Sequence, residues 1–354
     1  MTPDPITDLC AILRGESIDV SGEARDRLIA TATAHRVDRL LAWRTGAITG
    51  EVRAAAILDE IDVRELNRVL AGLEEHGVVP LVLKGAALAH THYEASWLRP
   101  RVDADLLIDS SHRPLVARVL VGLGYTQPPF VSGELVMYQM PFARAHGMGE
   151  MHLDVHWRIA NPQLFVDMPG YDELATRAST ISVRGQSVRM PRPVDALLLA
   201  CVHRAAHHDL SDDLIWLYDI HLLAERFTAA DWSDFVTLAS AHRVCALCGD
   251  GLRAARKCFY TSIPSDVASH LVSDAKRSER SAVYLRKDLS RFDRLMVDLR
   301  ALGTRECLRL LSEHLIPPAG YITRKYDVRV QAQLPLFYLR RVAGGCKSWF
   351  QRRV

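Results

Sequence analysis

The sequence has no uninterrupted apolar stretch long enough to cross a bilayer, and residues 1–20 contain no basic segment followed by an apolar one. Its net charge is only +2. Basic residues outnumber acidic ones from Tyr321 onward, and we interpret this excess as a solvent-exposed helical surface. We therefore expect a cytoplasmic protein with no membrane partner. A nucleic-acid partner is possible, but the charge does not indicate one.

Cysteine is too sparse for a disulfide framework, because seven cysteines are scattered over 354 residues. Cys245 and Cys248 have half of the spacing of a zinc ribbon, but no second pair and no paired histidines follow at a suitable distance. This favours packing inside a helix over metal binding. The sequence also lacks the P-loop, dinucleotide-binding and serine-hydrolase motifs, GxxxxGK[ST], GxGxxG and GxSxG.

The composition, with 49% hydrophobic and 24% charged residues, indicates a globular protein with a sizeable core. Hydrophobic spacing is helical up to His76 and again after Pro193, and strand-like between them. We predict an α+β fold with three parts: a helical N-terminal segment (1–76), a catalytic core (77–190) and a helical C-terminal domain (191–354).

Alternating and apolar runs predict strands in the central part over residues 78–83, 102–108, 135–142 and 151–159. Residues 180–190 are typical of a hairpin that turns at Arg184 and Gly185. Gly77 is placed to end a helix in a left-handed conformation.

The most informative stretch is 78–109, where Asp103 and Asp105 interrupt an apolar strand. Residues two apart in a strand point to the same face, with Cα atoms about 6 to 7 Å apart. Burying two carboxylates is costly unless a cation compensates them, so the pair indicates a divalent metal site.

Asp154 is the best candidate for a third carboxylate, because it lies on the polar face of the predicted strand 151–159 together with His152, His156 and Arg158. Three carboxylates and substrate phosphates suit Mg²⁺, with Mn²⁺ as an alternative. Such a site serves in-line displacement at phosphorus.

Lys84 and Gly85 lie at a strand-to-helix junction, where free backbone N–H groups favour an anion. A tight turn that needs glycine explains Gly85 equally well on its own. The distance along the chain to Asp103 favours the anion site.

Three segments, LVLKGAAL, LRPRVDADLLI and LDVHW, resemble the pattern LKGxAL, Arg then DxDLLV, and (E/D)xHW. This is the pattern of an uncharacterised nucleotidyltransferase family within the DNA polymerase β-like nucleotidyltransferase superfamily. Residues 203–225 and 314–326 also resemble the helical region of that family.

The resemblance implies a small mixed sheet flanked by helices, with Asp103 and Asp105 as metal ligands and Asp154 as third ligand or base. It also implies that Lys84 and Gly85 border the triphosphate of a bound NTP. At the next position the superfamily usually has Ser or Gly, whereas this chain has Ala86, so a hydroxyl contact to the phosphates is missing and the backbone amides must bind them. Arg99 is placed to pair with a phosphate or with Asp109.

A second cluster comprises His203, His207, His208 and Asp209. His203 and His207 are spaced for shared metal ligation on a helix, and His208-Asp209 resembles the HD phosphohydrolases. That fold needs further ligands on helices, whereas strands interrupt the helical pattern here. We expect these residues to line the cleft opposite the sheet or to end a helix, and we expect Trp216 in the core.

These observations predict an enzyme: a magnesium-dependent nucleotidyltransferase that transfers a nucleoside monophosphate from an NTP to a hydroxyl or phosphate and releases pyrophosphate. The acceptor could be a small molecule, a peptide or protein, or an RNA end. Two alternatives stay open: a transferase that uses a nucleotide sugar at the same metal site, and a non-catalytic nucleotide-binding or interaction module.

Overall fold

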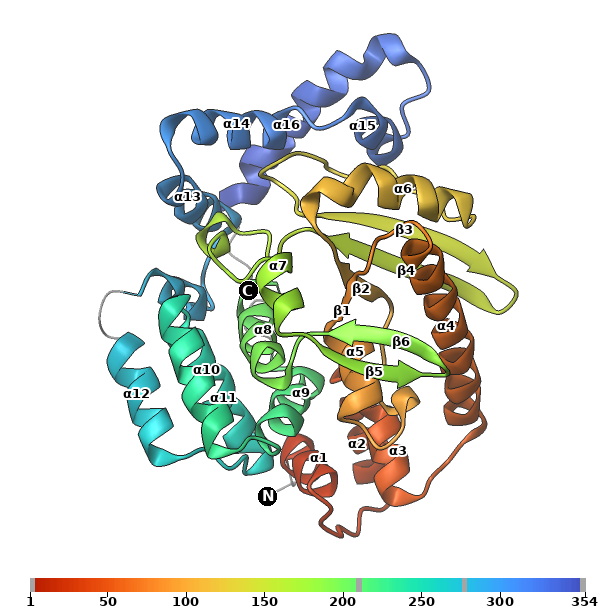
Figure 1. Ribbon diagram of the computed structural model, residues 1–354, viewed down its shortest axis with the longest axis vertical. Coiled ribbons are helices and arrows are strands. Elements are labelled where there is room, and N and C mark those ends of the chain that lie inside the picture. The colour runs from red at the N-terminus through yellow and green to blue at the C-terminus, as the bar shows by residue number, and fades with distance from the viewer. Residues whose placement is uncertain (1–3, 208–211, 276–278, 351–354) are drawn as a thin grey trace.

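The computed structural model describes residues 4–207, 212–275 and 279–350, the last six of these by their backbone alone. The chain folds as an α+β protein in which helices flank a small mixed sheet (Figure 1). This confirms the predicted fold class. In the described residues, no helix is long and apolar enough to cross a membrane.

Four strands form the central sheet in the spatial order β1-β2-β4-β3. They are β1 (Leu81–Leu83), β2 (Ala104–Leu107), β3 (Gln139–His146) and β4 (Gly149–His156). The central strands β2 and β4 run parallel, whereas β1 pairs with β2, and β3 with β4, in antiparallel fashion. The register between β2 and β4 places Asp105 directly opposite Asp154.

Sequence alternation locates these strands but misplaces their ends. The prediction of a strand over 135–142 is wrong by four residues at each end, because β3 runs from Gln139 to His146. A tight turn at residues 147–148 joins β3 to β4, and the pairing of His146 with Gly149 sets where β3 lies. Asp103 lies just before β2 instead of inside it.

The hairpin predicted over 180–190 is present as β5 (Ser179–Val183) and β6 (Gln186–Met190). Its two turn residues, Arg184 and Gly185, have φ values of 52° and 84°, which a type I′ turn requires. β6 packs against β1, so the hairpin lies beside the edge of the central sheet.

Three helices pack next to the sheet: α4 (Gly50–Glu74), α5 (Lys84–Thr91) and α6 (Arg113–Gly122). Leu66 and Leu73 of α4 and Leu120 of α6 share one apolar cluster with the sheet residues Leu106 and Val155. The chain leaves α4 through Gly77 at φ 75°, as predicted.

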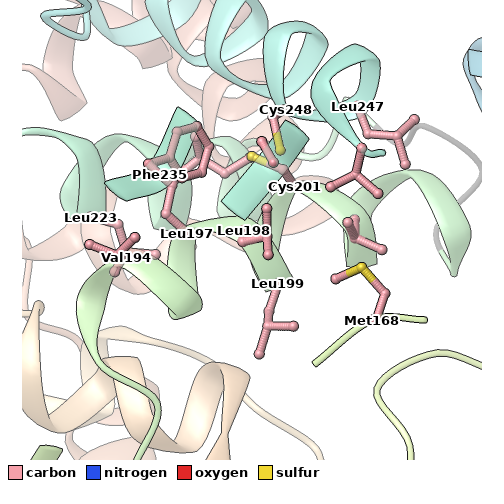
Figure 2. Close-up of a cluster of buried hydrophobic side chains, with 14 of the residues drawn as sticks. Met168, Val194, Leu197, Leu198, Leu199, Cys201, Leu223, Phe235, Leu247 and Cys248 are labelled. Atoms are coloured by element: carbon pink, nitrogen blue, oxygen red, sulfur yellow. The ribbon is translucent and has the colours of Figure 1, made fainter. Parts of the chain in front are cut away.

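A helical layer follows the hairpin. It consists of α8 (Pro193–Ala206), α9 (Leu214–Ala224), α10 (Ala229–Ala241), α11 (Cys245–Phe259) and α12 (Ser265–Ala275). Figure 2 shows its core, where Leu197, Cys201, Phe235 and Cys248 are buried together. Cys245 and Cys248 are both buried in α11 with free thiols, which confirms that this pair is a packing feature.

The first helices are α1 (Pro5–Leu13), α2 (Glu23–Ala34) and α3 (Asp38–Thr45). They share a core with α9, in which Leu28 and Leu40 lie with Leu214 and Leu217. The helical residues before position 77 are thus divided between two cores, because α4 belongs to the sheet. The division into three parts stays a prediction.

The remaining elements lie between or beyond these layers. They are α7 (Tyr171–Thr176), α13 (Arg291–Ala301), α14 (Thr304–Leu315), α15 (Ala319–Tyr326) and α16 (Leu334–Phe350), with short 3-10 helices η1 (Ser96–Leu98), η2 (Ser110–His112), η3 (Gln163–Phe165), η4 (Arg280–Leu285) and η5 (Gln331–Gln333). In Figure 1, α14 to α16 cap the end of the molecule next to α6. Glu313 of α14 accepts hydrogen bonds from the backbone N–H groups of Glu134, Leu135 and Val136.

A buried ion pair joins the sheet region to the helical layer. The guanidinium group of Arg99, which follows η1, donates from Nε and Nη2 to both carboxylate oxygens of Asp219 on α9, at 2.7 to 3.1 Å. The Tyr93 hydroxyl donates to the same carboxylate at 2.6 Å. The side chains of Arg99 and Asp219 are only 2% and 4% exposed.

Because the pair is buried, removing one charge leaves the other without compensation. We expect Asp219→Asn to lower the free energy of unfolding by about 3 to 5 kcal/mol. Asp234→Asn is the matched control, because Asp234 pairs with Arg192 at 2.9 Å but is 55% exposed, so its loss costs about 0 to 1 kcal/mol. Urea unfolding followed by circular dichroism measures both. Equal losses would show that Arg99 does not depend on Asp219.

Candidate active site

Asp105 is the centre of the polar cluster on the sheet. It is 7% exposed, and its Oδ1 accepts hydrogen bonds from Nζ of Lys84 at 2.6 Å and from Nε2 of His156 at 2.8 Å. Burial alone would raise the pKa of Asp105, but the positive charges and hydrogen bonds of Lys84 and His156 outweigh it and hold the pKa well below its usual range. Asp105 is therefore a carboxylate at all ordinary pH values.

Asp154 lies opposite Asp105 on β4. Its Oδ2 accepts a hydrogen bond from Nε2 of Gln139 on β3 at 2.6 Å. Burial raises the pKa of Asp154, and the negative charge of Asp105 adds to the rise, although His156 opposes it. Two neighbouring carboxylates thus differ in basicity, because only Asp105 has direct cationic partners.

Asp103 lines the same cavity as Asp105 and Asp154. Burial and the negative charges of these two carboxylates raise the pKa of Asp103. Among the described residues, Asp105, Asp154 and His156 form a group of three candidate metal ligands whose ligand atoms all lie within 4.8 Å of one another. Asp103 is not part of that group, although the sequence predicts it as a ligand equal to Asp105.

The junction of β1 and α5 places the three predicted residues Lys84, Gly85 and Ala86 in different surroundings. Lys84 has a φ of 52° and reaches Asp105. A Cβ atom on Gly85 would lie 3.2 Å from Cζ of Arg99, so any larger residue here would press on the buried guanidinium group. Ala86 is 3% exposed and belongs to the apolar core of the sheet.

Arg99 lines the cavity, and its carboxylate partner differs from the predicted one. It pairs with Asp219 instead of Asp109. Asp109 caps η2 by accepting a hydrogen bond from the backbone N–H of Ser111 at 2.7 Å. The sequence missed Asp219 because 120 residues separate it from Arg99.

These residues surround a cavity of about 300 Å³ between the sheet and the helical layer. The sheet region contributes Asp103, Asp105, Asp154 and Gln139 to its lining, and the helical layer contributes His203, His207 and Trp216. Arg36, Arg99 and Arg101 also line it. A second, largely apolar cavity of about 280 Å³ adjoins it and shares Lys84, His203 and Trp216 as lining residues. The two cavities together offer room for a charged group beside the carboxylates and an apolar group beyond Lys84.

The histidine cluster lies partly outside the described residues, since His208 and Asp209 are not among them. His203 and His207 stack with ring centroids 5.1 Å apart and line the cavity, as expected. His207 also ends α8. The expectation that Trp216 belongs to the core is wrong in part, because its ring is only half-buried and lines both cavities.

The group formed by Asp105, Asp154 and His156 fits a divalent metal ion. Lys84 places a positive charge beside Asp105, which compensates part of the buried negative charge of the cluster. The sequence missed His156 as part of the site, although its position two residues after Asp154 on the polar face of one strand was the signal for it. Gln139 gave no such signal, because β3 was misplaced.

The pKa of Asp105 is lowered and that of Asp103 is raised, so removing the charge of each residue should change the stability of the fold in opposite directions. Above the pKa of an unfolded Asp, about 3.9, ionised Asp105 stabilises the fold, and this contribution is lost as pH falls through its lower folded pKa. The raised pKa of Asp103 means that the fold loses stability as pH rises through it. At pH 7 without metal, we expect Asp105→Asn to cost about 3 kcal/mol, whereas Asp103→Asn raises the midpoint of unfolding.

Chemical unfolding at pH 7 and at pH 5 in the presence of a chelator measures these effects. Asp109→Asn is the control, since asparagine caps a helix as well as aspartate and should leave stability unchanged. A loss of stability in Asp103→Asn as large as that in Asp105→Asn would contradict this account.

Residues 22–260 match the profile of a family described as uncharacterised nucleotidyltransferase. A solved structure, that of an antigenic nucleotidyltransferase-like protein from Paracoccidioides brasiliensis, is 14% identical with a TM-score of 0.38, and the alignment covers 59% of this chain and 96% of that one. No curated protein matches the chain. The family match contains the whole cluster, from Lys84 to Asp219, and more than half of the sequence. The chain therefore belongs to the uncharacterised nucleotidyltransferase family.

Proposed function

We propose that this protein is a metal-dependent nucleotidyltransferase that moves a nucleoside monophosphate from an NTP to a hydroxyl or phosphate of an acceptor. One observation carries the proposal: Asp103, Asp105 and Asp154 line one cavity, and the last two lie opposite each other on paired strands. Membership in a nucleotidyltransferase family supports it.

Asp105 and Asp154 would hold the metal, with Asp103 at the edge of the site. We assign His156 to orient Asp105, because its Nε2 donates to Oδ1 of that residue. With His156 in that role, the protein ligands are carboxylates, which suit Mg²⁺ or Mn²⁺. Bound there, the metal would lower the pKa of the attacking hydroxyl and neutralise charge that develops on the phosphoryl group.

Asp154 is the group we assign to remove the acceptor proton. Unlike Asp105, it makes no ion pair with Lys84, and Gln139 fixes its orientation. In the proposed reaction, the acceptor oxygen forms a bond to the α-phosphorus while the bond to the bridging oxygen of the β-phosphate breaks. The proton passes to Asp154 and pyrophosphate leaves.

Lys84 and Gly85 would lie beside the triphosphate. Lys84 neutralises Asp105 in the structure, and positive charge supplied at the carboxylates would free its ammonium group to contact a phosphate. Gly85 lines the cavity, whereas the side chain of Ala86 packs in the core, so only the backbone of residue 86 is available to a ligand. We assign Arg99 to support the cavity wall through Asp219.

The proposal predicts that NMP transfer depends on the carboxylates and on metal. Incubation with each α-labelled NTP, Mg²⁺ and an extract that contains acceptors should give labelled product and pyrophosphate, and a chelator should stop both. Asp103→Asn and Asp105→Asn should each reduce pyrophosphate release at least ~100-fold, as expected when a group that stabilises transition-state charge is lost.

Asp109→Asn serves as the control, because Asp109 follows the same strand but caps η2. It should retain wild-type activity. Full activity in both Asp103→Asn and Asp105→Asn would overturn the site. Tight NTP binding without metal and without turnover would instead identify a non-catalytic nucleotide-binding module.

A further inference from the structure

Four cationic side chains line the cavity that holds the carboxylates: Lys84, Arg36, Arg99 and Arg101. Three of them already have carboxylate partners within the chain. Lys84 pairs with Asp105 at 2.6 Å, Arg99 with Asp219 at 2.7 Å, and Arg101 with Asp59 at 2.6 Å. These pairs explain why three cations are stable in a partly buried place.

Arg36 differs from the other three. Among the described residues, no carboxylate lies within 4.0 Å of its guanidinium group, which instead lies over the ring of Trp216 at 5.3 Å. Arg99 lies near the same ring at 5.1 Å. Burial and the positive charge of Arg99 lower the pKa of Arg36, and the more distant carboxylates of Asp103, Asp213 and Asp219 oppose this only in part, although an arginine remains protonated at neutral pH. The cavity thus holds a desolvated positive charge that an anionic ligand would neutralise.

The backbone around Arg36 does not explain this placement. Arg36 joins α2 to α3 with a φ of 59°, and Arg243 joins α10 to α11 with a φ of 55°. Both lie in the same tetrapeptide, Ala-His-Arg-Val, and in both the N–H groups of Arg and Val bond back into the preceding helix. The left-handed arginine is therefore a property of the turn, and Arg243 is simply exposed.

The position of the turn is what distinguishes Arg36. The carbonyl of His35 accepts a hydrogen bond from the backbone N–H of Ile215 at 3.3 Å, which fixes the turn on the first residues of α9. Val37 is fully buried in the core shared by α2, α3 and α9. The N-terminal helices thus present one guanidinium group to a cavity whose carboxylates belong to the sheet.

We propose that Arg36 binds the triphosphate of the nucleotide substrate, so that the N-terminal helices contribute a binding residue to the active site. This inference rests on the proposed function. Guanidinium groups recognise phosphate oxygens through two parallel N–H donors, and Arg36 has no competing carboxylate at that distance in the described residues. Binding would also relieve the repulsion between Arg36 and Arg99.

Calorimetric titration of the full chain tests this, with each NTP and with inorganic tripolyphosphate, in Ca²⁺ to avoid turnover. Arg36→Gly removes the charge and suits the positive φ, so the fold should keep its stability. We expect it to weaken binding of both NTP and tripolyphosphate about 10- to 100-fold, the effect of losing a hydrogen bond to a charged group. Arg36→Lys should recover part of the affinity.

Arg243→Gly is the matched control, because it makes the same change in the same turn on the exposed side of the helical layer, and it should bind like the wild type. If Arg36→Gly binds both ligands within about twofold of the wild-type affinity, the role of Arg36 is overturned but the proposed function is not. Weakened NTP binding with unchanged tripolyphosphate binding would overturn the phosphate contact in favour of a nucleoside contact. A wild-type protein that binds neither ligand would overturn the proposed function itself.

Discussion

The ion pair between Arg99 and Asp219 is the constraint on which the geometry of the cavity depends. Arg99 precedes β2 and Asp219 lies on α9, so this contact holds the helical layer against the sheet. Two charges removed from water are stable only when their hydrogen bonds are satisfied. Here Nε and Nη2 of Arg99 and the hydroxyl of Tyr93 all donate to the carboxylate of Asp219. Gly85, at the start of α5, has no side chain and so leaves room for the guanidinium group of Arg99. The ion pair therefore also depends on the residue at this position. A change at any of these positions would shift one wall of the cavity relative to the carboxylates on the other.

The carboxylate wall combines a stabilised charge with two costly ones. Asp105 is held ionised by Lys84 and His156, whereas Asp103 and Asp154 have raised pKa values because they are buried near other negative charges. The fold therefore carries an electrostatic cost at the residues assigned to chemistry, and a bound cation would remove it. Such a cost is expected where carboxylates are arranged for binding instead of for stability. The ammonium group of Lys84 offsets part of this cost through its ion pair with Asp105.

The parts of the site that lie close together in the sequence could be predicted from it. Alternation in 151–159 placed Asp154 on a polar face, and the apolar residues around Asp103 and Asp105 placed them on a neighbouring strand, which the pairing of β2 with β4 bears out for Asp105. What could not be predicted depends on contacts between distant segments. Asp219, Gln139 and Arg36 reach the site through the packing of the helices and of β3. The spacing of apolar residues along the sequence carries no information about such partners. The same reason accounts for Trp216, whose apolar neighbours predicted a core position although one side of the ring lines the cavities.

The structure changes the interpretation of Ala86, which the sequence alone presents as a position that lacks a hydroxyl contact to the phosphates. Its side chain packs with the core of the sheet, where a hydroxyl group would face apolar neighbours instead of the cavity. The loss of a serine at this position is thus no loss of a cavity group in this fold. Positive charge around the cavity comes instead from side chains on three separate segments, with Lys84 on α5, Arg99 and Arg101 before β2, and Arg36 between α2 and α3. In the proposed complex, phosphate recognition therefore depends on how the N-terminal helices dock on α9. That docking positions Arg36, which alone among the four lysine and arginine side chains lining the cavity has no described carboxylate within 4.0 Å.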